Sequence, residues 1–175
     1  MIKWSFIPSL FTVLNLAAGA TSLLLTIQGH YRIALLMILS AAIFDVLDGL
    51  IARLLNCPSE FGKQLDSLAD LISFGAAPAF LVLFDQLDGS HGPASVAAVL
   101  FIICGALRLA RFNISGSNDG FTGMPITAAG TLLSLVSLTD NTLRPVFIVI
   151  LMIVLSLLMI SRVPFPSFKN RMVRK

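Results

Sequence analysis

The sequence predicts an all-α, polytopic membrane protein with six transmembrane helices, and three observations lead to this prediction. Hydrophobic residues make up 57% of the 175-residue chain and charged residues only 12%, whereas a soluble domain carries about 25% charged residues. A domain of this size could not hide so much apolar surface from water. Apolar runs recur at roughly the 20-residue length that a helix needs to cross a bilayer, and turn-forming residues separate them.

Six apolar segments are expected to form the spans of a single domain that covers residues 1–175. They lie at about 7–27, 33–55, 63–84, 94–112, 124–139 and 145–161. The first segment lacks a small-residue cleavage site, which favours a retained helix over a removed signal peptide. Pro125 is expected in the first turn of the fifth helix, where proline is tolerated. Residues 1–6 indicate an interfacial lead-in to the first span.

The placement of basic residues predicts the orientation of these spans. Arg32 and Arg144 fall on one side of the membrane. The other side receives Lys3, Arg53, Lys63, Arg108, Arg111, Arg162, Lys169, Arg171, Arg174 and Lys175. This positive-inside bias predicts that both chain ends are cytoplasmic, in a membrane that we expect to be a prokaryotic cytoplasmic membrane. The basic tail at 163–175 either lies against anionic headgroups or acts only as a topology signal.

Four acidic residues lie within or at the ends of the second and third segments. They are Asp45, Asp48, Asp66 and Asp70. Each ionised carboxylate costs roughly 2.5–3.5 kcal/mol in hydrocarbon, so intramembrane acids usually mark a functional site. Their i,i+3 and i,i+4 spacing puts each pair on one helix face, and the short connection predicts antiparallel packing that lets the pairs face each other. The alternative is water-exposed acids or pairing with Arg53 and Lys63, but two bases cannot neutralise four acids.

A set of oxygen ligands favours a hard cation, and we expect Mg²⁺ or Mn²⁺. Two such ions are a common arrangement for phosphoryl chemistry. Gly49 and Ala52 lie on the same helix side and lack bulk, so a ligand could approach the backbone there. Close packing between membrane helices would also explain them. Arg53 follows and could offer its charged fork to a phosphate.

The stretch from Asp45 to Asp70 resembles the signature of the CDP-alcohol phosphotransferases, D-x2-D-G-x2-A-R-x8-G-x3-D-x3-D. All eight fixed positions are present within 26 residues. The resemblance implies a six-helix membrane fold, usually a homodimer, whose active site opens to the cytoplasm and to lipid. It implies that the first three signature aspartates bind metal, and that Asp70 is both a ligand and the general base. The residues implied to border the nucleotide or its diphosphate are Gly49, Ala52, Arg53 and Gly62.

Further blocks resemble the phosphatidylserine synthase branch of that family. The segment 67–79 is similar to the branch's S-F-G-x-A-P-A block, and segments 108–113 and 121–125 are similar to two others. The segment 8–15 is similar to its opening block, although Ser9 stands where asparagine is usual. In segment 121–125, Met124 stands where leucine is usual. This resemblance implies transfer of the phosphatidyl group from CDP-diacylglycerol to L-serine, giving phosphatidylserine and CMP in phospholipid biosynthesis.

Other polar residues have two interpretations each. Arg108 and Arg111, at i,i+3, could clamp the serine carboxylate or a phosphate, and Asn113 could add a hydrogen bond. Both arginines could instead anchor the helix at the interface. Thr12 and Asn15 could contact the nucleotide or could bond across helices.

Two alternative functions remain open from the sequence. The same chemistry could use another acceptor, either glycerol 3-phosphate or an inositol compound. Outside this class, intramembrane carboxylates could serve a divalent-cation transporter, which predicts acids spread along a crossing path. The expected partners are CDP-diacylglycerol, L-serine, membrane lipid and a second copy of the chain, with no nucleic acid.

Overall fold

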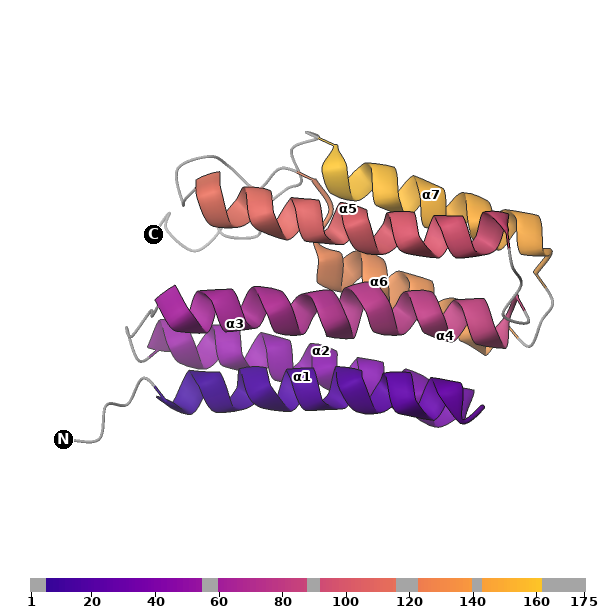
Figure 1. Ribbon diagram of the computed structural model, residues 1–175. Helices are drawn as coiled ribbons and strands as arrows, with labels where there is room; N and C mark the ends of the chain where they lie inside the picture. The colour runs from indigo at the N-terminus through magenta and orange to yellow at the C-terminus, as the bar shows by residue number, and fades with distance from the viewer. Residues whose placement is uncertain (1–5, 55–59, 88–91, 116–122, 140–142, 162–175) are drawn as a thin grey trace, which may run out of the picture.

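The computed structural model describes residues 6–54, 60–87, 92–115, 123–139 and 143–161, and these residues are helical throughout their regular structure (Figure 1). The predicted all-α class is therefore confirmed. The elements in chain order are α1 (Phe6–Ile27), α2 (Tyr31–Leu54), α3 (Glu60–Asp70), η1 (Leu71–Ala76), α4 (Ala77–Asp85), α5 (Pro93–Ser115), α6 (Ile126–Ser134), η3 (Leu135–Leu138) and α7 (Pro145–Ile160). The predicted tail at 163–175 and all but Phe6 of the lead-in lie outside the described residues.

The helices α1 and α2 form an antiparallel hairpin and pack along most of their length (Figure 1). Gly29 ends α1 with a left-handed backbone, φ +78°, which glycine adopts without steric cost. The His30 N–H then donates to the Leu25 carbonyl at 2.9 Å, which satisfies one of the free carbonyls at the helix end. The sequence predicts a break here from the stretch Gln28-Gly29-His30.

The third predicted span is one continuous helical rod, Glu60–Asp85, in which a π-helical turn separates α3 from α4. This η1 turn packs closely against α1. Ser73 Oγ donates to the Asn15 carbonyl at 3.0 Å, and a Cβ added at Gly19 would lie 2.7 Å from Ser73 Cα. The rod therefore approaches α1 more closely than any larger residue at position 19 would allow.

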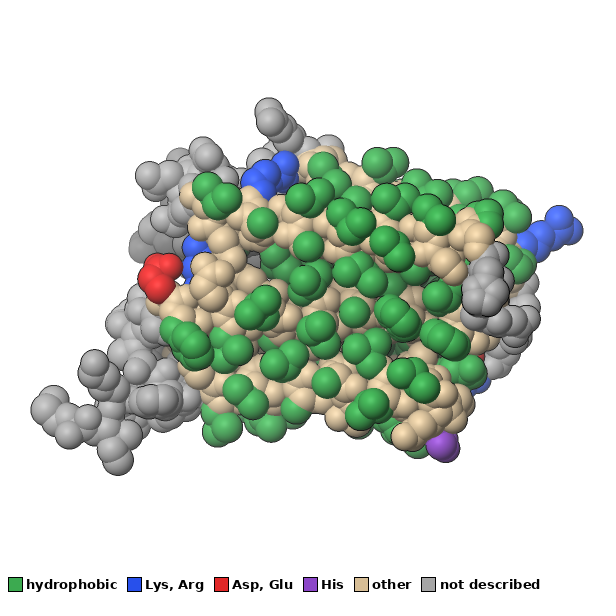
Figure 2. All heavy atoms as spheres, in the orientation of Figure 1, with side chains coloured by type: hydrophobic (Ala, Val, Ile, Leu, Met, Phe, Trp, Pro, Cys, Tyr) green, Lys and Arg blue, Asp and Glu red, His purple; other side chains and the backbone are tan. Residues whose placement is uncertain are grey.

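Within the described residues, four helices are long and apolar enough to cross a membrane: Ser9–Ile27, Tyr31–Ala52, Glu60–Asp85 and Pro93–Ile114. Two further apolar helices, Ile126–Leu138 and Pro145–Ile160, are shorter. Figure 2 shows hydrophobic side chains covering the visible face along the helices, with the described charged side chains at the two ends. A bilayer can solvate such a surface, whereas water cannot, so these are the features of an integral membrane protein.

The structure changes two details of the predicted arrangement. Pro125 is not in the first turn of the fifth helix but directly before it, with φ −57° and ψ 139°. The second and third spans run antiparallel as predicted (Figure 1), but α2 contacts α4 and η1 and scarcely touches α3. Near α3, it is α1 that packs against both α2 and α3. The backbones of α2 and α3 are therefore apart where the aspartates lie, which leaves room for their side chains between the two helices.

Candidate active site

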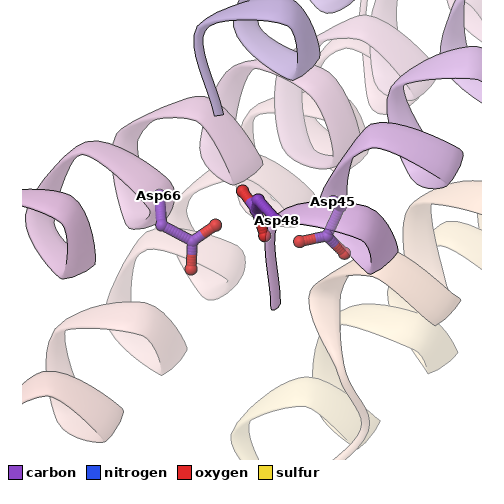
Figure 3. Close-up of side chains that lie close together, drawn as sticks. All are labelled: Asp45, Asp48 and Asp66. Carbon is purple, nitrogen blue, oxygen red and sulfur yellow. The ribbon is translucent and has the colours of Figure 1, made fainter. Parts of the chain in front are cut away.

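Three aspartates from two helices meet at one end of the bundle. Asp45 and Asp48 come from α2 and Asp66 comes from α3, and one carboxylate oxygen of each lies within 4.8 Å of the others. Figure 3 shows the three carboxylates turned toward a common space. Helical spacing explains the pair on α2, because residues three apart share one face. The predicted convergence of these acids is present in the structure.

The fourth aspartate, Asp70, lies one helical turn after Asp66, at the end of α3. Its side chain is buried and lines the same cavity as the other three, but it is outside the group whose oxygens lie within 4.8 Å of one another. The structure thus separates a compact trio from a single deeper carboxylate.

Two buried side chains of α1 hold these aspartates from behind. Thr12 Oγ1 donates to Asp48 Oδ2 at 3.0 Å, and Asn15 Nδ2 donates to Asp70 Oδ1 at 3.2 Å. Neither Thr12 nor Asn15 lines the cavity. Of the two interpretations that the sequence left open, the structure shows bonding across helices, and a nucleotide contact by either residue stays a prediction.

The aspartates line a cavity of about 460 Å³. One wall comes from α2 and α3 and is acidic. The opposite wall comes from α5 and from the start of α6. The lining residues are Asp45, Val46, Asp48, Gly49, Leu50, Lys63, Asp66, Ser67, Asp70, Arg108, Leu109, Phe112, Asn113, Pro125, Ile126 and Thr127.

The α5 wall supplies the polar groups that face the acids. Arg108 is only 9% exposed and lines the cavity, and its Nε has no hydrogen-bond partner among the described residues. Asn113 Nδ2 donates to Ser67 Oγ at 3.0 Å, and Lys63 Nζ donates to the Asn113 carbonyl at 3.3 Å. The sequence did not predict Ser67 as a cavity residue, and it indicated Lys63 only as a charge on the cytoplasmic side or as a partner of the acids. The position of Ser67, directly after a signature aspartate, was the one available signal.

Arg111 points elsewhere. Its Nη1 donates to the Ile160 carbonyl at 3.3 Å, at the end of α7, and the residue does not line the cavity. A cation there stabilises the negative end of the α7 dipole. The predicted clamp of Arg108 and Arg111 is therefore not assembled in this cavity, where Arg108 and Asn113 are the members present.

The small residues of the signature occupy different positions. Gly49 lines the cavity beside Asp48. Ala52 and Gly62 are half-buried and are not among the lining residues. The side chain of Arg53 lies outside the described part of the structure. A diphosphate contact by these residues stays a prediction.

The carboxylate cluster fits a divalent cation. Asp66 Oδ1 is buried and has no hydrogen-bond partner in the described part of the chain, which is costly for a charged oxygen. Among the described side chains, no lysine or arginine is ion-paired with Asp45, Asp48 or Asp66. Clustered carboxylate oxygens without basic partners are the donor set that hard cations such as Mg²⁺ and Mn²⁺ use. The trio could therefore hold a metal ion.

The chain is similar to known lipid-synthesis enzymes over almost its whole length. It is 41% identical over 165 residues to the archaetidylserine synthase of Methanothermobacter thermautotrophicus, and this match covers 91% of this chain and 69% of the relative. It is 37% identical over 167 residues to the CDP-diacylglycerol–serine O-phosphatidyltransferase of Bacillus subtilis, covering 95% and 93%. The enzyme of the same name from Helicobacter pylori strain 26695 is 37% identical over 174 residues, covering 93% and 73%.

The family model described as CDP-alcohol phosphatidyltransferase matches residues 5–168. This match includes all four aspartates, the α1 residues that hold two of them, and the cavity wall on α5. Because the match spans nearly the entire sequence and the relatives agree with it, the chain belongs to the CDP-alcohol phosphatidyltransferase family.

Proposed function

We propose that this protein transfers the phosphatidyl group of CDP-diacylglycerol to L-serine and releases CMP. The observation that carries the proposal is the aspartate trio in a cavity whose opposite wall holds a buried arginine. An acidic wall suits a cation-bound diphosphate, and a basic wall suits a second anionic substrate. Two of the relatives are named CDP-diacylglycerol–serine O-phosphatidyltransferase, and this arrangement fits that reaction.

The lipid part of the donor has one specific alternative. The relative from Methanothermobacter thermautotrophicus is an archaetidylserine synthase, so the donor here could carry an archaeal ether lipid in place of diacylglycerol. The cavity lies at the end of the bundle and is lined by apolar as well as polar residues, Leu50 and Leu109 among them. Acyl or ether chains could remain in lipid while the polar head enters, whichever donor is used.

The proposed reaction is direct displacement at phosphorus. The serine hydroxyl oxygen forms a bond to the phosphorus that carries the lipid, the bond from that phosphorus to the CMP oxygen breaks, and CMP leaves with the electron pair. Asp70 takes the hydroxyl proton as general base. The hydrogen bond from Asn15 fixes the carboxylate of Asp70 in one orientation for this transfer.

The residues that would hold the metal are Asp45, Asp48 and Asp66, with Asp70 as a further ligand. When bound, Mg²⁺ or Mn²⁺, in two sites, would neutralise the diphosphate and improve CMP as a leaving group. Thr12 keeps the carboxylate of Asp48 turned toward the cluster through its hydrogen bond. Gly49 lets the substrate approach the α2 backbone on the cavity side.

We further propose that all six predicted segments span the bilayer, as one domain, with the cavity facing the cytoplasm. In the predicted orientation the cavity end is the side that receives most of the basic residues, which supports this topology. The family resemblance supports a homodimer. Cysteine labelling from either side of a sealed vesicle tests the orientation, and cross-linking in the membrane tests the dimer.

The decisive experiment measures CMP release by the purified protein with a panel of donors and acceptors. CDP-diacylglycerol and its archaeal ether counterpart are each combined with L-serine, glycerol 3-phosphate or inositol, with and without a chelator. We expect serine-dependent release that the chelator abolishes. Stimulation by another acceptor but not by serine would reject the serine assignment, and metal flux into liposomes without CDP-lipid would support the transporter.

A further inference from the structure

The helical turn that follows Asp70 departs from α-helical geometry. The π-helix η1 spans Leu71–Ala76, and Asp70 directly precedes it with an α-helical φ of −60° and ψ of −40°. Single π-helical turns inside α-helices are rare and are found frequently at functional sites. Ser73 lies within this turn and is fully buried. The proposed general base therefore lies at the point where the rod Glu60–Asp85 changes its helical geometry.

The hydroxyl of Ser73 bonds across to α1. Serine and threonine hydroxyls in helices often bond to a carbonyl three or four residues earlier, as Ser156 does with the Met152 carbonyl at 2.7 Å. Ser73 Oγ instead donates to the Asn15 carbonyl at 3.0 Å. In the α1 ladder this carbonyl also accepts the N–H of Gly19. Because Gly19 has no side chain, the Ser73 hydroxyl can reach the carbonyl beside it.

Asn15 contacts the rod at a second point, through its side chain. Asn15 Nδ2 donates to Asp70 Oδ1 at 3.2 Å. Asn15 Oδ1 is buried and has no hydrogen-bond partner among the described residues, so no second side-chain bond holds the amide. The orientation of Asp70 therefore depends on where the main chain of Asn15 lies relative to the rod. The bond from Ser73, three residues after Asp70, fixes that main chain.

We infer that Ser73 is a positioning residue for the proposed general base. Its bond to the main chain of Asn15 holds the rod in the register at which the Asn15 amide meets Asp70. The inference rests on the proposed function. Neither Ser73 nor Asn15 lines the cavity, so Ser73 acts on the reaction only through the placement of Asp70. A displacement of about 1 Å at a catalytic group can lower a rate by about a hundredfold.

The test compares two buried serines that make the same kind of bond. Ser73→Ala removes the hydroxyl and changes the buried volume little. Ser22→Ala is the matched control, because Ser22 is also fully buried and its Oγ donates to the Ala34 carbonyl of another helix at 2.9 Å. Ser22 does not line the cavity. Each variant loses one bond between helices, so the two unfolding temperatures should fall by similar amounts.

The readout is kcat and KM for the CDP-lipid, measured as CMP release with the acceptor that wild type uses. Ser73→Ala should lower kcat by about tenfold to a hundredfold, because the base is displaced. Its KM should stay within about twofold of wild type, as expected for a loss confined to the chemical step. Stabilisation by Mn²⁺ should also persist, because Asp45, Asp48 and Asp66 keep their places. Ser22→Ala should leave kcat and KM unchanged.

A double variant tests whether Ser73 acts through Asn15. Asn15→Ala removes the amide and keeps the main-chain carbonyl that Ser73 contacts. Ser73→Ala should lower kcat no further in this background, whereas the effects of two independent residues would multiply. Gly19→Ala gives a second reading if Ser73→Ala does not fold. Its added Cβ would lie 2.7 Å from Ser73 Cα, so it should displace Ser73 and produce the same loss of kcat.

Three results would overturn the inference while leaving the proposed function intact. They are a wild-type kcat in both Ser73→Ala and Gly19→Ala, equal losses of kcat in Ser73→Ala and Ser22→Ala, and effects of Ser73→Ala and Asn15→Ala that multiply. Failure of the proposed function gives a different result, which is no CMP release by wild type with any acceptor of the panel. That result would reject the general base and its positioning residue together.

Discussion

The two ends of the helical bundle hold their acids in opposite ways. At the end of α4, Asp85 accepts hydrogen bonds from Ser137 Oγ at 2.5 Å and from Gln86 Nε2 at 3.0 Å. At the other end, one oxygen from each of three carboxylates lies within 4.8 Å of the others, and Asp66 Oδ1 has no hydrogen-bond partner among the residues that the structure describes. Both of these bonds reach Asp85 Oδ2, and an acid that accepts bonds from neighbouring side chains in this way can act as a structural tie. Acids that converge without enough donors indicate that a ligand completes the site.

The α1 helix sharpens this contrast, because it supports the cavity acids without satisfying them fully. Thr12 and Asn15 provide one hydrogen bond each, to Asp48 and Asp70. A carboxylate has about four acceptor positions. Both acids also line the cavity, so α1 orients them and leaves them able to bind.

The largest expected effect is that of Asp70→Asn. An amide cannot take the serine proton, so CMP release should fall roughly 10²–10⁴-fold, the usual contribution of a general base. The variant should still fold and bind CDP, which thermal unfolding with and without CDP measures. Wild-type-like turnover would remove Asp70 as the base.

The next largest effect concerns metal binding, which we expect at the end of the bundle that holds Asp66 and not at the end that holds Asp85. At 100 times its dissociation constant, a bound ion stabilises a protein by about 2.7 kcal/mol. We expect Mg²⁺ or Mn²⁺ to raise the unfolding temperature of wild type and of Asp85→Asn, and a chelator to reverse the effect. Asp66→Asn should lose most of this stabilisation. Equal responses in Asp66→Asn and wild type would place the ion elsewhere.

The support from α1 should have an intermediate effect. Thr12→Val removes the hydrogen bond to Asp48, and a bond to a charged group contributes about 1.5–3 kcal/mol, so CMP release should fall by about tenfold or more. Thr12→Ser should restore much of the activity. The matched control is Thr26→Val, because Thr26 is also buried in α1 but donates to the Ser22 carbonyl of its own helix at 2.9 Å. Equal losses in Thr12→Val and Thr26→Val would indicate a general packing effect.

The smallest expected effect on activity is that of Asp85→Asn. The bonds from Ser137 and Gln86 would weaken, and the free energy of unfolding should drop by about 1 kcal/mol. CMP release should stay within about twofold of wild type, since Asp85 does not line the cavity. A metal-dependent loss of activity in this variant would contradict the distinction between the two ends.

Much of the candidate site follows from local pattern. The spacing of Asp45 and Asp48 puts both on one face of α2, and the short connection to the next span returns Asp66 to the same end of the bundle. The structure adds what the pattern did not reveal. It places Ser67 in the cavity wall, turns Arg111 toward the end of α7, and inserts a π-helical turn directly after Asp70.

The sequence by itself determined the helices, their approximate ends and the end of the bundle at which the acids gather. Apolar length and helical periodicity are properties of one segment, and burial of apolar surface in lipid is non-directional. These features can therefore be predicted without knowing which residues each segment packs against. Only the tertiary structure decided which donor meets which carboxylate and which helix start borders the cavity. Hydrogen bonds act over about 3 Å and need alignment, and the pairs involved, such as Asn15 with Asp70, lie 55 residues apart in the chain.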